Sequence, residues 1–293
     1  MTSGIAAALN QSGDPEDDAL FIEYNDFLVD RRFAQQTRTA MLGFIAETGK
    51  DWRKFHLSGV TPDLRQAVLE SGISHKIVRD RICPWIDLTK VSPGRSGYFA
   101  VLSRNTRQQI QQSLRLYEAE GQVQLTLAGT EAEASLMLNE MCGLHRKAWR
   151  ERRGHEGAFG SPRFMRFAQH LASKGAGCGS VQLMRASAGP APIGYLLNFV
   201  HRGHVYAYQS GFSFRDDNRF RPGLVTHALA IVHAREQGCR GYHFMAGEGR
   251  YKASLANTEE HLFWMTLRHD DLISRAEEAA RALKDRLRAL IRR

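Results

Sequence analysis

The stretch HVYAYQSGFSFRDDNRFRPGLVTHALAIVHAREQGCRGYHFMAG (204–247) contains the pattern that decides the fold. It predicts a strand, a polar loop, a helix that starts at Pro222 and ends at Gly238, and a second strand. A helix N-terminus presents unpaired N–H groups and a partial positive charge, so it binds phosphates. Gly223 lets the backbone come close to such a ligand. The helix start is therefore a candidate phosphate site, and an ordinary strand–helix–strand crossover is the alternative interpretation.

Cationic side chains surround the same helix start. Arg215, Arg219 and Arg221 precede the helix and add positive charge beside it. Together with the helix N-terminus they could hold the pyrophosphate of an acyl-coenzyme A. The candidate cofactor-binding residues are Arg219, Arg221, Pro222, Gly223 and Leu224.

The composition is that of a folded protein. Of 293 residues, 43% are hydrophobic and 24% are charged, which predicts a packed core. The net charge of +9 favours an anionic partner, which could be coenzyme phosphates, a nucleotide sugar, nucleic acid or an anionic membrane surface. A solvated basic surface without a partner is the alternative.

The cysteines and the chain start bear on the compartment. The four cysteines form no C-x-x-C pair and fit no zinc or disulfide framework, which is typical of thiols in a reducing compartment. The N-terminus has no basic segment followed by a long apolar one, and no stretch approaches the roughly 20 apolar residues of a membrane span. We therefore expect a cytoplasmic protein.

Turn signals and hydrophobic periodicity divide the sequence into four segments. The polar, acidic start predicts a loose tail, the turn SPGRSG (92–97) marks a boundary, and the basic C-terminus has the apolar stripe of an amphipathic helix. The segments are 1–18 (tail), 19–97 (first α/β segment), 98–269 (second α/β segment) and 270–293 (basic helix).

Each α/β segment is expected to contain both helices and strands. In the first segment, strands are predicted at 19–30, 52–60 and 73–88, and helices at 31–49 and 61–72. In the second segment, helices are predicted at 99–121, 130–153, 161–175 and 222–238, the second of them opening with the capping box Thr130 and Glu133. Strands are predicted there at 123–128, 180–187, 192–203, 204–213, 239–247 and 260–269.

A weak internal repeat follows from these elements. Strand, helix and strand occur at 21–60 and again at 204–247, and the closing strands KFHLSG (54–59) and GYHFMAG (241–247) are alike. If this is a duplication, the first copy lacks its early elements, because nothing before residue 20 is expected to supply them.

Several stretches together resemble a known family. They are LSRNTRQQIQQSLRLYEAEG (102–121), LHRKAWRERRGHEGAFGSPRF (144–164), IGYLLNF (193–199), YAYQSGF (206–212), PGLVTHALAIVHAREQG (222–238) and YHFMAGEGRYK (242–252). In this order they resemble the BioF2-like or CelD-like acetyltransferases, a branch of the GNAT (Gcn5-related N-acetyltransferase) superfamily related to the Fem aminoacyl transferases. The resemblance implies an α/β GNAT fold, with a mixed sheet flanked by helices over 98–269. It also implies that 19–97 is a truncated first GNAT-like lobe.

The resemblance also assigns residues. The GNAT phosphate loop usually has the pattern Q/R-x-x-G-x-G/A, and here Arg221-Pro222-Gly223-Leu224-Val225 keeps one glycine. An aromatic–lysine pair near the active site of Fem enzymes matches Tyr251-Lys252. Fem enzymes take their acyl group from a charged tRNA, so the donor class stays open between acyl-CoA and tRNA.

Acyl transfer to an amine needs a base, an oxyanion stabiliser and an acid for the leaving group. Glu248 could be the base, Tyr251 the acid and Lys252 a stabiliser of negative charge. The alternatives are a solvated carboxylate, a packed aromatic ring and a surface lysine. These three residues are the candidate catalytic set.

A helix and a strand end supply candidate acceptor contacts. His145 and Trp149 share a helix face at i, i+4 spacing, and Gln209 and Ser210 end a strand. Ordinary helix packing and a turn are the alternatives. His201 and His204 flank a hairpin glycine without an acidic third ligand, so no metal site is expected.

The resulting functional prediction is an acyltransferase. It would move an acyl group, with acetyl as first choice, from acyl-CoA to an amine or hydroxyl of a small molecule or cell-envelope precursor. Two alternatives stay open: Fem-like transfer from aminoacyl-tRNA, and a non-catalytic GNAT-like accessory protein of a polysaccharide-synthesis complex. The 270–293 helix is expected to dock on the protein, with contact to an anionic membrane as the alternative.

Overall fold

The computed structural model describes residues 6–14, 18, 22–48, 52–175, 177–247 and 249–268. The described chain forms two compact units. The first unit contains the residues up to Arg81 and those from His261 onward, and the second unit runs from Ile82 to Glu260. The chain passes between the units inside strands β3 (His75–Asp87) and β9 (Thr258–Arg268). This division differs from the boundary expected at the turn 92–97.

The first unit has a small sheet with two helices. Its elements are β1 (Ala6–Ala8), the 3-10 turn η1 (Arg31–Phe33), α1 (Ala34–Glu47), β2 (Lys54–Val60), α2 (Pro62–Glu70), the start of β3 and most of β9. Strand β2 pairs in parallel with β1 and antiparallel with β9. Part of the expected loose tail is therefore a strand.

The strand expected at 19–30 does not form over the described residues 22–30. Only Asn25 makes a bridge, to Val60. The reason is that polar side chains there bind the backbone: the Asn25 amide donates to the carbonyl oxygens of Leu9 and Ser58, and the Asp26 carboxylate accepts from the Phe27 N–H. Such side-chain bonds compete with a strand ladder.

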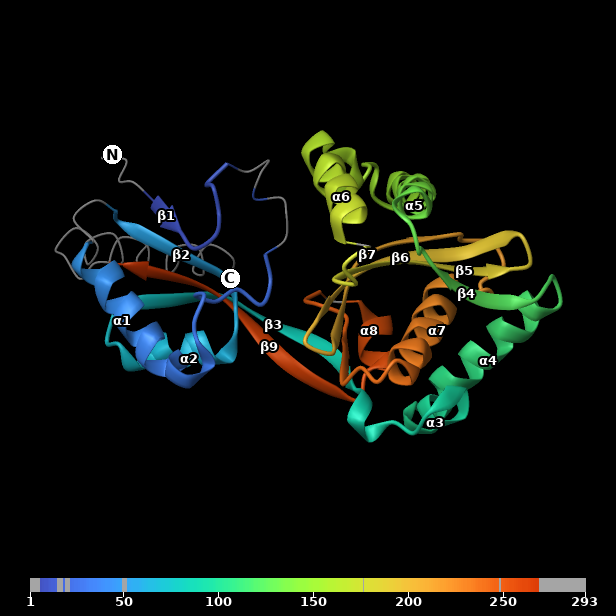
Figure 1. The fold of residues 1–293 in the computed structure, drawn as a ribbon, viewed down its shortest axis with the longest axis horizontal. Coiled ribbons are helices and arrows are strands. Elements are labelled where there is room, and N and C mark those ends of the chain that lie inside the picture. Colours follow the sequence, from blue (N-terminus) through green and yellow to red (C-terminus); the bar gives the residue numbers. More distant parts are fainter. Residues whose placement is uncertain are drawn as a thin grey trace, which may run out of the picture. The chain divides into compact units, whose positions relative to one another are not determined.

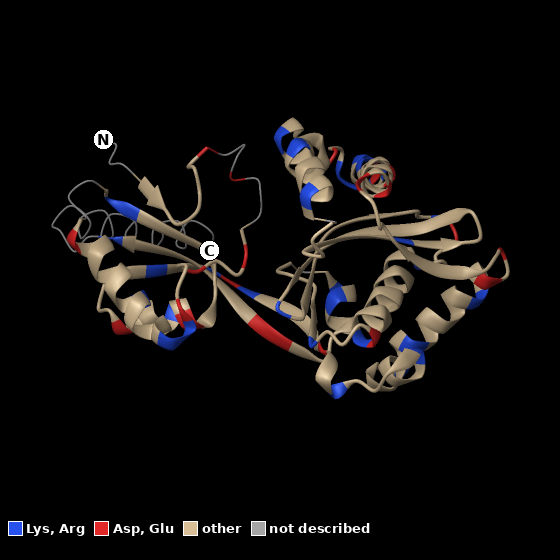
Figure 2. Cartoon of the chain, viewed as in Figure 1, with Lys and Arg blue, Asp and Glu red and all other residues tan. Residues whose placement is uncertain are grey.

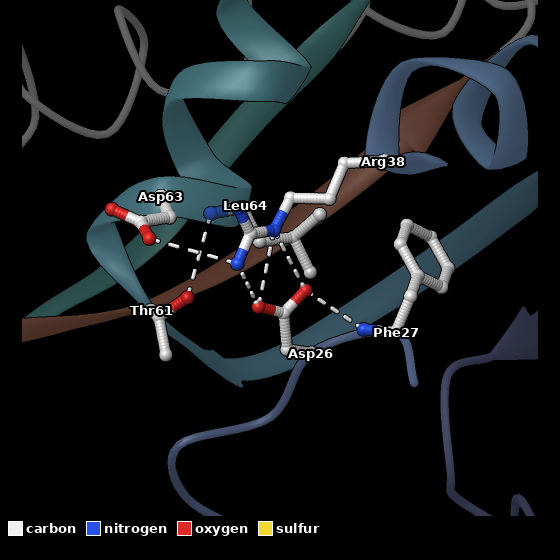
Figure 3. Close-up of polar contacts among 6 residues, drawn as sticks. All are labelled: Asp26, Phe27, Arg38, Thr61, Asp63 and Leu64. Carbon is white, nitrogen blue, oxygen red and sulfur yellow. Dashed lines mark hydrogen bonds and ion pairs between the residues drawn. The ribbon is translucent and has the colours of Figure 1, made fainter. Parts of the chain in front are cut away.

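A nearly buried ion pair ties this segment to α1 (Figure 3). The Arg38 guanidinium donates to the Asp26 carboxylate, with an Nη2–Oδ2 distance of 2.6 Å, and Asp63 lies 3.6 Å away at the start of α2. Thr61 caps α2 by accepting from the Leu64 N–H at 3.4 Å. These contacts hold the loop before α1 against both helices.

The second unit contains a larger mixed sheet. Its elements are the end of β3, η2 (Leu88–Lys90), α3 (Gly94–Val101), α4 (Arg104–Glu118), β4 (Val123–Leu127), α5 (Glu131–Arg153), η3 (Ala158–Gly160), α6 (Pro162–Gly175), β5 (Val181–Ala188), β6 (Ala191–His201), β7 (His204–Phe212), α7 (Pro222–Glu236), β8 (Gly241–His243), α8 (Arg250–Leu255) and the start of β9. The strand order is β3-β8-β7-β6-β5-β4. Strands β7 and β8 pair in parallel, and the β3–β8, β4–β5, β5–β6 and β6–β7 pairs are antiparallel.

Helices cover both faces of this sheet, as expected for the GNAT fold (Figure 1). Helices α5 and α6 lie on one face, and α3, α4 and α7 lie on the other. Strand β6 contacts the helices on both faces of the sheet. Leu196 packs in the core with residues of α7, and on the opposite face the Tyr195 hydroxyl donates to the Glu140 carboxylate of α5. Basic residues occur along α4, α5 and α6 (Figure 2).

One expected helix is two helices. The stretch 99–121 contains the end of α3 and all of α4, separated at Leu102 and Ser103. The Ser103 hydroxyl accepts from the Thr106 N–H at 3.2 Å and caps α4. Helix α3 begins at Gly94, inside the stretch expected to be a turn. The capping box of α5, Thr130 with Glu133, is present as predicted.

The strand–helix–strand repeat occurs with a different first strand. Its first copy is β1-α1-β2, so residues 6–8 supply the strand that was expected at 19–30. Its second copy is β7-α7-β8. In each copy the two strands are parallel, and the second strand has an antiparallel neighbour that begins in the other unit, β9 for β2 and β3 for β8.

The basic helix expected over 270–293 lies outside the described residues. Within the part of the chain that the structure describes, no helix is long and apolar enough to cross a membrane.

Candidate active site

The site lies where two parallel strands separate. Strands β7 and β8 are paired only at 204–206 and 241–243, after which β8 ends and β7 continues to Phe212. A bulge in β7, opposite Leu197 and Asn198 of β6, changes the register at the same level. A cavity of about 850 Å³ opens beside residues 207–212 of β7.

The cavity walls come from helices on opposite faces of the sheet. His145, Trp149 and Arg152 of α5 line one side. The start of α7 lines the other side, together with Tyr251 of α8. Because α5 and α7 cover different faces (Figure 1), the cavity extends from one face of the sheet to the other beside β7. Two ligands can therefore approach one point from opposite directions.

The start of α7 presents free backbone donors to the cavity. Arg221 is the N-cap residue, and its side chain makes no capping bond. The first helical bond runs from the Val225 N–H to the Arg221 carbonyl, so the N–H groups of Gly223 and Leu224 have no partner among the described residues. The predicted residues Arg221, Pro222, Gly223 and Leu224 all line the cavity.

Arg219 is the member of the predicted cofactor set that does not line the cavity. Its guanidinium is exposed and forms a two-pronged ion pair with Asp217, with an Nη2–Oδ2 distance of 2.7 Å. Arg215 does line the cavity, but the Glu120 carboxylate binds its guanidinium. The Arg215 Cζ atom also lies 4.3 Å from the centroid of the Phe220 ring. Among these arginines, Arg221 has an exposed guanidinium that no described residue binds.

His145 and Trp149 stack on each other, with ring centroids 5.7 Å apart. The Nδ1 atom of His145 lies 2.9 Å from the Ser210 carbonyl oxygen, which can only accept, so Nδ1 carries the proton. Burial lowers the pKa of His145 and keeps the imidazole neutral. The predicted acceptor residues, including Gln209, thus meet along one wall. Ser210 contributes its backbone carbonyl to this contact.

Tyr251 and Lys252 lie in the short helix α8, which the sequence did not predict. The Lys252 ammonium donates to the carbonyl oxygens of Ala246 at 2.8 Å and Met245 at 3.3 Å. It therefore holds a turn in which Met245 has the left-handed φ of +61°. Burial raises the pKa of Tyr251 to about 12. Glu248, the expected base, lies outside the described residues.

His227 is a cavity residue that the sequence analysis missed. It lies one turn after the start of α7, is 2% exposed, and stacks under the Tyr251 ring with centroids 5.6 Å apart. Burial, reinforced by the positive charge of Lys252, lowers its pKa to about 3. The sequence pattern that indicates this residue is a histidine among largely apolar residues, four positions after Gly223 at the helix start.

A second histidine cluster lies outside the cavity. The Nε2 atom of His243 lies 2.9 Å from His204 Nδ1, and its Nδ1 atom lies 2.9 Å from the Glu260 carboxylate. The imidazole stacks between the rings of Trp85 and Tyr206. His243 is thus a histidine whose hydrogen bonds are satisfied outside the cavity. Over the described ranges, no group of three His, Cys, Asp or Glu side chains is arranged to hold a metal ion.

Solved structures share this architecture at low sequence identity. The C-terminal domain of a putative lysylphosphatidylglycerol synthetase from Agrobacterium fabrum is 14% identical, with a TM-score of 0.54, over 88% of this chain and 78% of that one. FemX is 12% identical, with a TM-score of 0.55, over 83% and 79%. L-PGS from Bacillus licheniformis is 9% identical, with a TM-score of 0.54, over 84% and 76%. These similarities show a common fold.

No match was found among the curated proteins. The model of one protein family, described as the acetyltransferase (GNAT) domain, matches residues 104–253. That range contains more than half of the chain and includes α5, α7, the part of β7 beside the cavity and the Tyr251-Lys252 pair. This chain belongs to the acetyltransferase (GNAT) domain family.

Proposed function

We propose that this protein transfers an acyl group from acyl-CoA to an amine or hydroxyl of a second substrate. The observation that carries the proposal is the cavity beside β7, which reaches from the start of α7 to the side of α5 that carries His145 and Trp149. A donor held at α7 and an acceptor held at α5 would meet where β7 and β8 separate. Holding two reactants in this way supplies much of the rate enhancement of a transfer reaction.

The donor side suits a pyrophosphate. The unpaired N–H groups of Gly223 and Leu224, the positive end of the α7 dipole and the Arg221 guanidinium all lie at one cavity wall. The N-cap residue Arg221 makes no side-chain capping bond, so the N–H groups of the second and third helical residues stay open to the cavity. The pyrophosphate of CoA would neutralise these positive groups.

The acceptor side suits an anionic molecule with a flat apolar face. Trp149 is 38% exposed and offers its ring, while Arg152 and Arg153 offer positive charge at the same wall. Sugar-containing precursors of the cell envelope have both properties, and they agree with the resemblance to the BioF2-like and CelD-like branch. A cytoplasmic location would provide acyl-CoA.

The chemistry needs few protein groups. The acceptor amine or hydroxyl attacks the thioester carbonyl carbon, the new C–N or C–O bond forms, the C–S bond breaks, and the acceptor proton leaves to a base. Tyr251 would donate a hydrogen bond to the leaving thiolate. Full proton transfer would be uphill, because its pKa is raised to about 12, whereas a thiol ionises near about 8.5.

Aminoacyl transfer from tRNA is the second candidate. It is favoured by the fold shared with FemX over 83% of the chain. Exposed basic residues on the described helices, such as Arg104 and Arg115 on α4 and Arg166 and Lys174 on α6, would suit an RNA backbone (Figure 2). In that case the same cavity would hold the 3′ end of the tRNA.

Calorimetry with acetyl-CoA and with bulk tRNA tests the proposal. We expect wild-type protein to bind acetyl-CoA, and Arg221→Gln to weaken that binding about two- to tenfold, the range for one partly solvated charged contact. Arg219→Gln is the matched control: it removes the same charge two residues away but outside the cavity, and should leave binding unchanged. Binding of tRNA without acetyl-CoA would favour the second candidate and contradict the first.

A further inference from the structure

His227 has an unusual environment for a buried histidine. It is 2% exposed, and among the described residues its one hydrogen-bond partner is the Tyr242 hydroxyl, 2.9 Å from Nδ1. Its Nε2 atom is buried and has no hydrogen-bond partner in the described part of the chain. The imidazole nevertheless forms part of the cavity wall. A buried polar atom without a partner costs free energy, so its presence at a ligand cavity calls for a functional explanation.

The Tyr242 hydroxyl determines which nitrogen carries the proton. Tyr242 is fully buried, and the hydroxyl has no other hydrogen-bond partner among the described residues. If Nδ1 carried the proton, the tyrosine O–H would be left without an acceptor. If the tyrosine O–H donates to Nδ1, the hydroxyl proton has its acceptor and only the lone pairs of the hydroxyl oxygen stay unused. The second arrangement is favoured, and it places the imidazole proton on Nε2.

The Nε2–H group is therefore an unsatisfied donor at the cavity wall. The rings of Phe212 and Phe244 meet the imidazole at steep angles, with centroids 5.8 Å and 5.2 Å away. Contacts between an N–H and an aromatic face are weak and do not replace a hydrogen bond. The group requires an acceptor atom, which the ligand can bring.

The atom that accepts the hydrogen bond from His227 is expected to be uncharged. His227 stays uncharged because burial and the positive charge of Lys252 both disfavour its protonation. A neutral N–H buried among aromatic rings suits a carbonyl oxygen better than a phosphate, which prefers the charged and backbone donors at the start of α7. Since a helix rises about 1.5 Å per residue, His227 lies about 6 Å along the axis from Gly223. It therefore lies within reach of an extended ligand whose phosphates bind the helix start.

We propose that the Nε2–H of His227 donates to an amide carbonyl oxygen in the pantetheine arm of the acyl-CoA donor. This rests on the proposed function, and it makes His227 a donor-specificity residue. The pantetheine arm has amide groups between its phosphates and its thioester, whereas the 3′ end of an aminoacyl-tRNA has none between its phosphate and its ester. Because Nε2 is buried, the contact requires the Tyr251 side chain to turn away from the imidazole on which it stacks.

Calorimetry with CoA and with ADP tests the proposal. ADP keeps a pyrophosphate but lacks the pantetheine arm. We expect His227→Leu to weaken CoA binding about tenfold, the usual effect of losing one hydrogen bond to a buried group, and to leave ADP binding within twofold of wild type. His227→Gln, which keeps an N–H near the position of Nε2, should recover most of the CoA affinity. Thermal melting would confirm that each variant is folded.

The outcomes separate this inference from the proposed function. If wild-type protein binds neither CoA nor acetyl-CoA, the proposed donor is wrong. If wild-type and His227→Leu bind CoA equally, the role of His227 is wrong while the donor stands. If His227→Leu weakens CoA binding and ADP binding equally, the role of His227 is structural, and the inference is also overturned.

A measurement on wild-type protein covers the case in which the variants do not fold. Nitrogen NMR of the histidine side chains reports which ring nitrogen is protonated. We expect a His227 signal with the proton on Nε2 at neutral pH, and we expect this signal to shift when CoA is added but not when ADP is added. A proton on Nδ1, or a signal that CoA leaves unchanged, would overturn the proposal.

Discussion

The Nδ1–H group of His145 donates a hydrogen bond to the Ser210 carbonyl oxygen, with an N–O distance of 2.9 Å. This bond joins helix α5 to strand β7 in the part of β7 that has left β8. The Trp149 ring stacks on the same imidazole, so this bond also helps to place Trp149 in the acceptor wall.

Loss of this bond should impair use of the acceptor. We expect His145→Leu to lower kcat/KM for the acceptor about tenfold, because small displacements of a bound reactant are costly in transfer reactions. His145→Asn should retain much of the activity, since its amide can still donate to the Ser210 carbonyl. Both variants should bind CoA as wild type does. An unchanged kcat/KM in folded His145→Leu would contradict the assignment.

Lys252 is expected to matter for turnover more than for donor binding. Its ammonium holds the carbonyl oxygens of Met245 and Ala246 beside the cavity. We expect Lys252→Met to lower kcat about ten- to a thousandfold, the range for loss of one charge-stabilising group, while the Kd for CoA changes much less. The assay follows identification of an acceptor by substrate screening. A folded Lys252→Met protein with full turnover would show that the lysine supports only the turn.

Acid should destabilise the protein through His227. The unfolded chain takes up a proton near the ordinary histidine pKa of 6.5, whereas the folded protein does not until about pH 3. Between these values the unfolded state binds more protons, so stability falls as pH falls, by up to about 1.4 kcal/mol per pH unit. Urea denaturation from pH 6.5 to 4 should show a shallower loss in His227→Leu than in wild type. Parallel profiles for the two proteins would refute this expectation.

The ion pair between Arg38 and Asp26 should stabilise the first unit. The Arg38 side chain is 10% exposed and that of Asp26 is 20% exposed, so removing one partner leaves a largely desolvated charge. We expect Arg38→Met to lower the free energy of unfolding by about 1–3 kcal/mol. Arg32→Met is the control, because the Arg32 pair with Asp30 is exposed and should have little effect. Equal effects of the two changes on the denaturation midpoint would contradict this prediction.

Much of the candidate site could be predicted because its signals are local. Pro222 and Gly223 mark a helix start within a few residues, and the i, i+4 spacing places His145 beside Trp149. The sequence could not distinguish Arg219 from Arg221. Both precede the same helix, but Asp217 binds the first, while the second faces the cavity. His227 was missed because its importance comes from Tyr242, a partner on another strand.

The sequence by itself determined the elements whose signals lie within a turn or two: the capping box of α5 and the start of α7. Only the tertiary structure decided which strands pair. Residues 6–8 pair with β2, whereas the aromatic-rich stretch around Asn25 does not form a strand over its described residues 22–30. Likewise β3 and β9 each continue from one unit into the other. Strand pairing depends on hydrogen bonds and burial between residues far apart in the chain, and local propensity does not encode these.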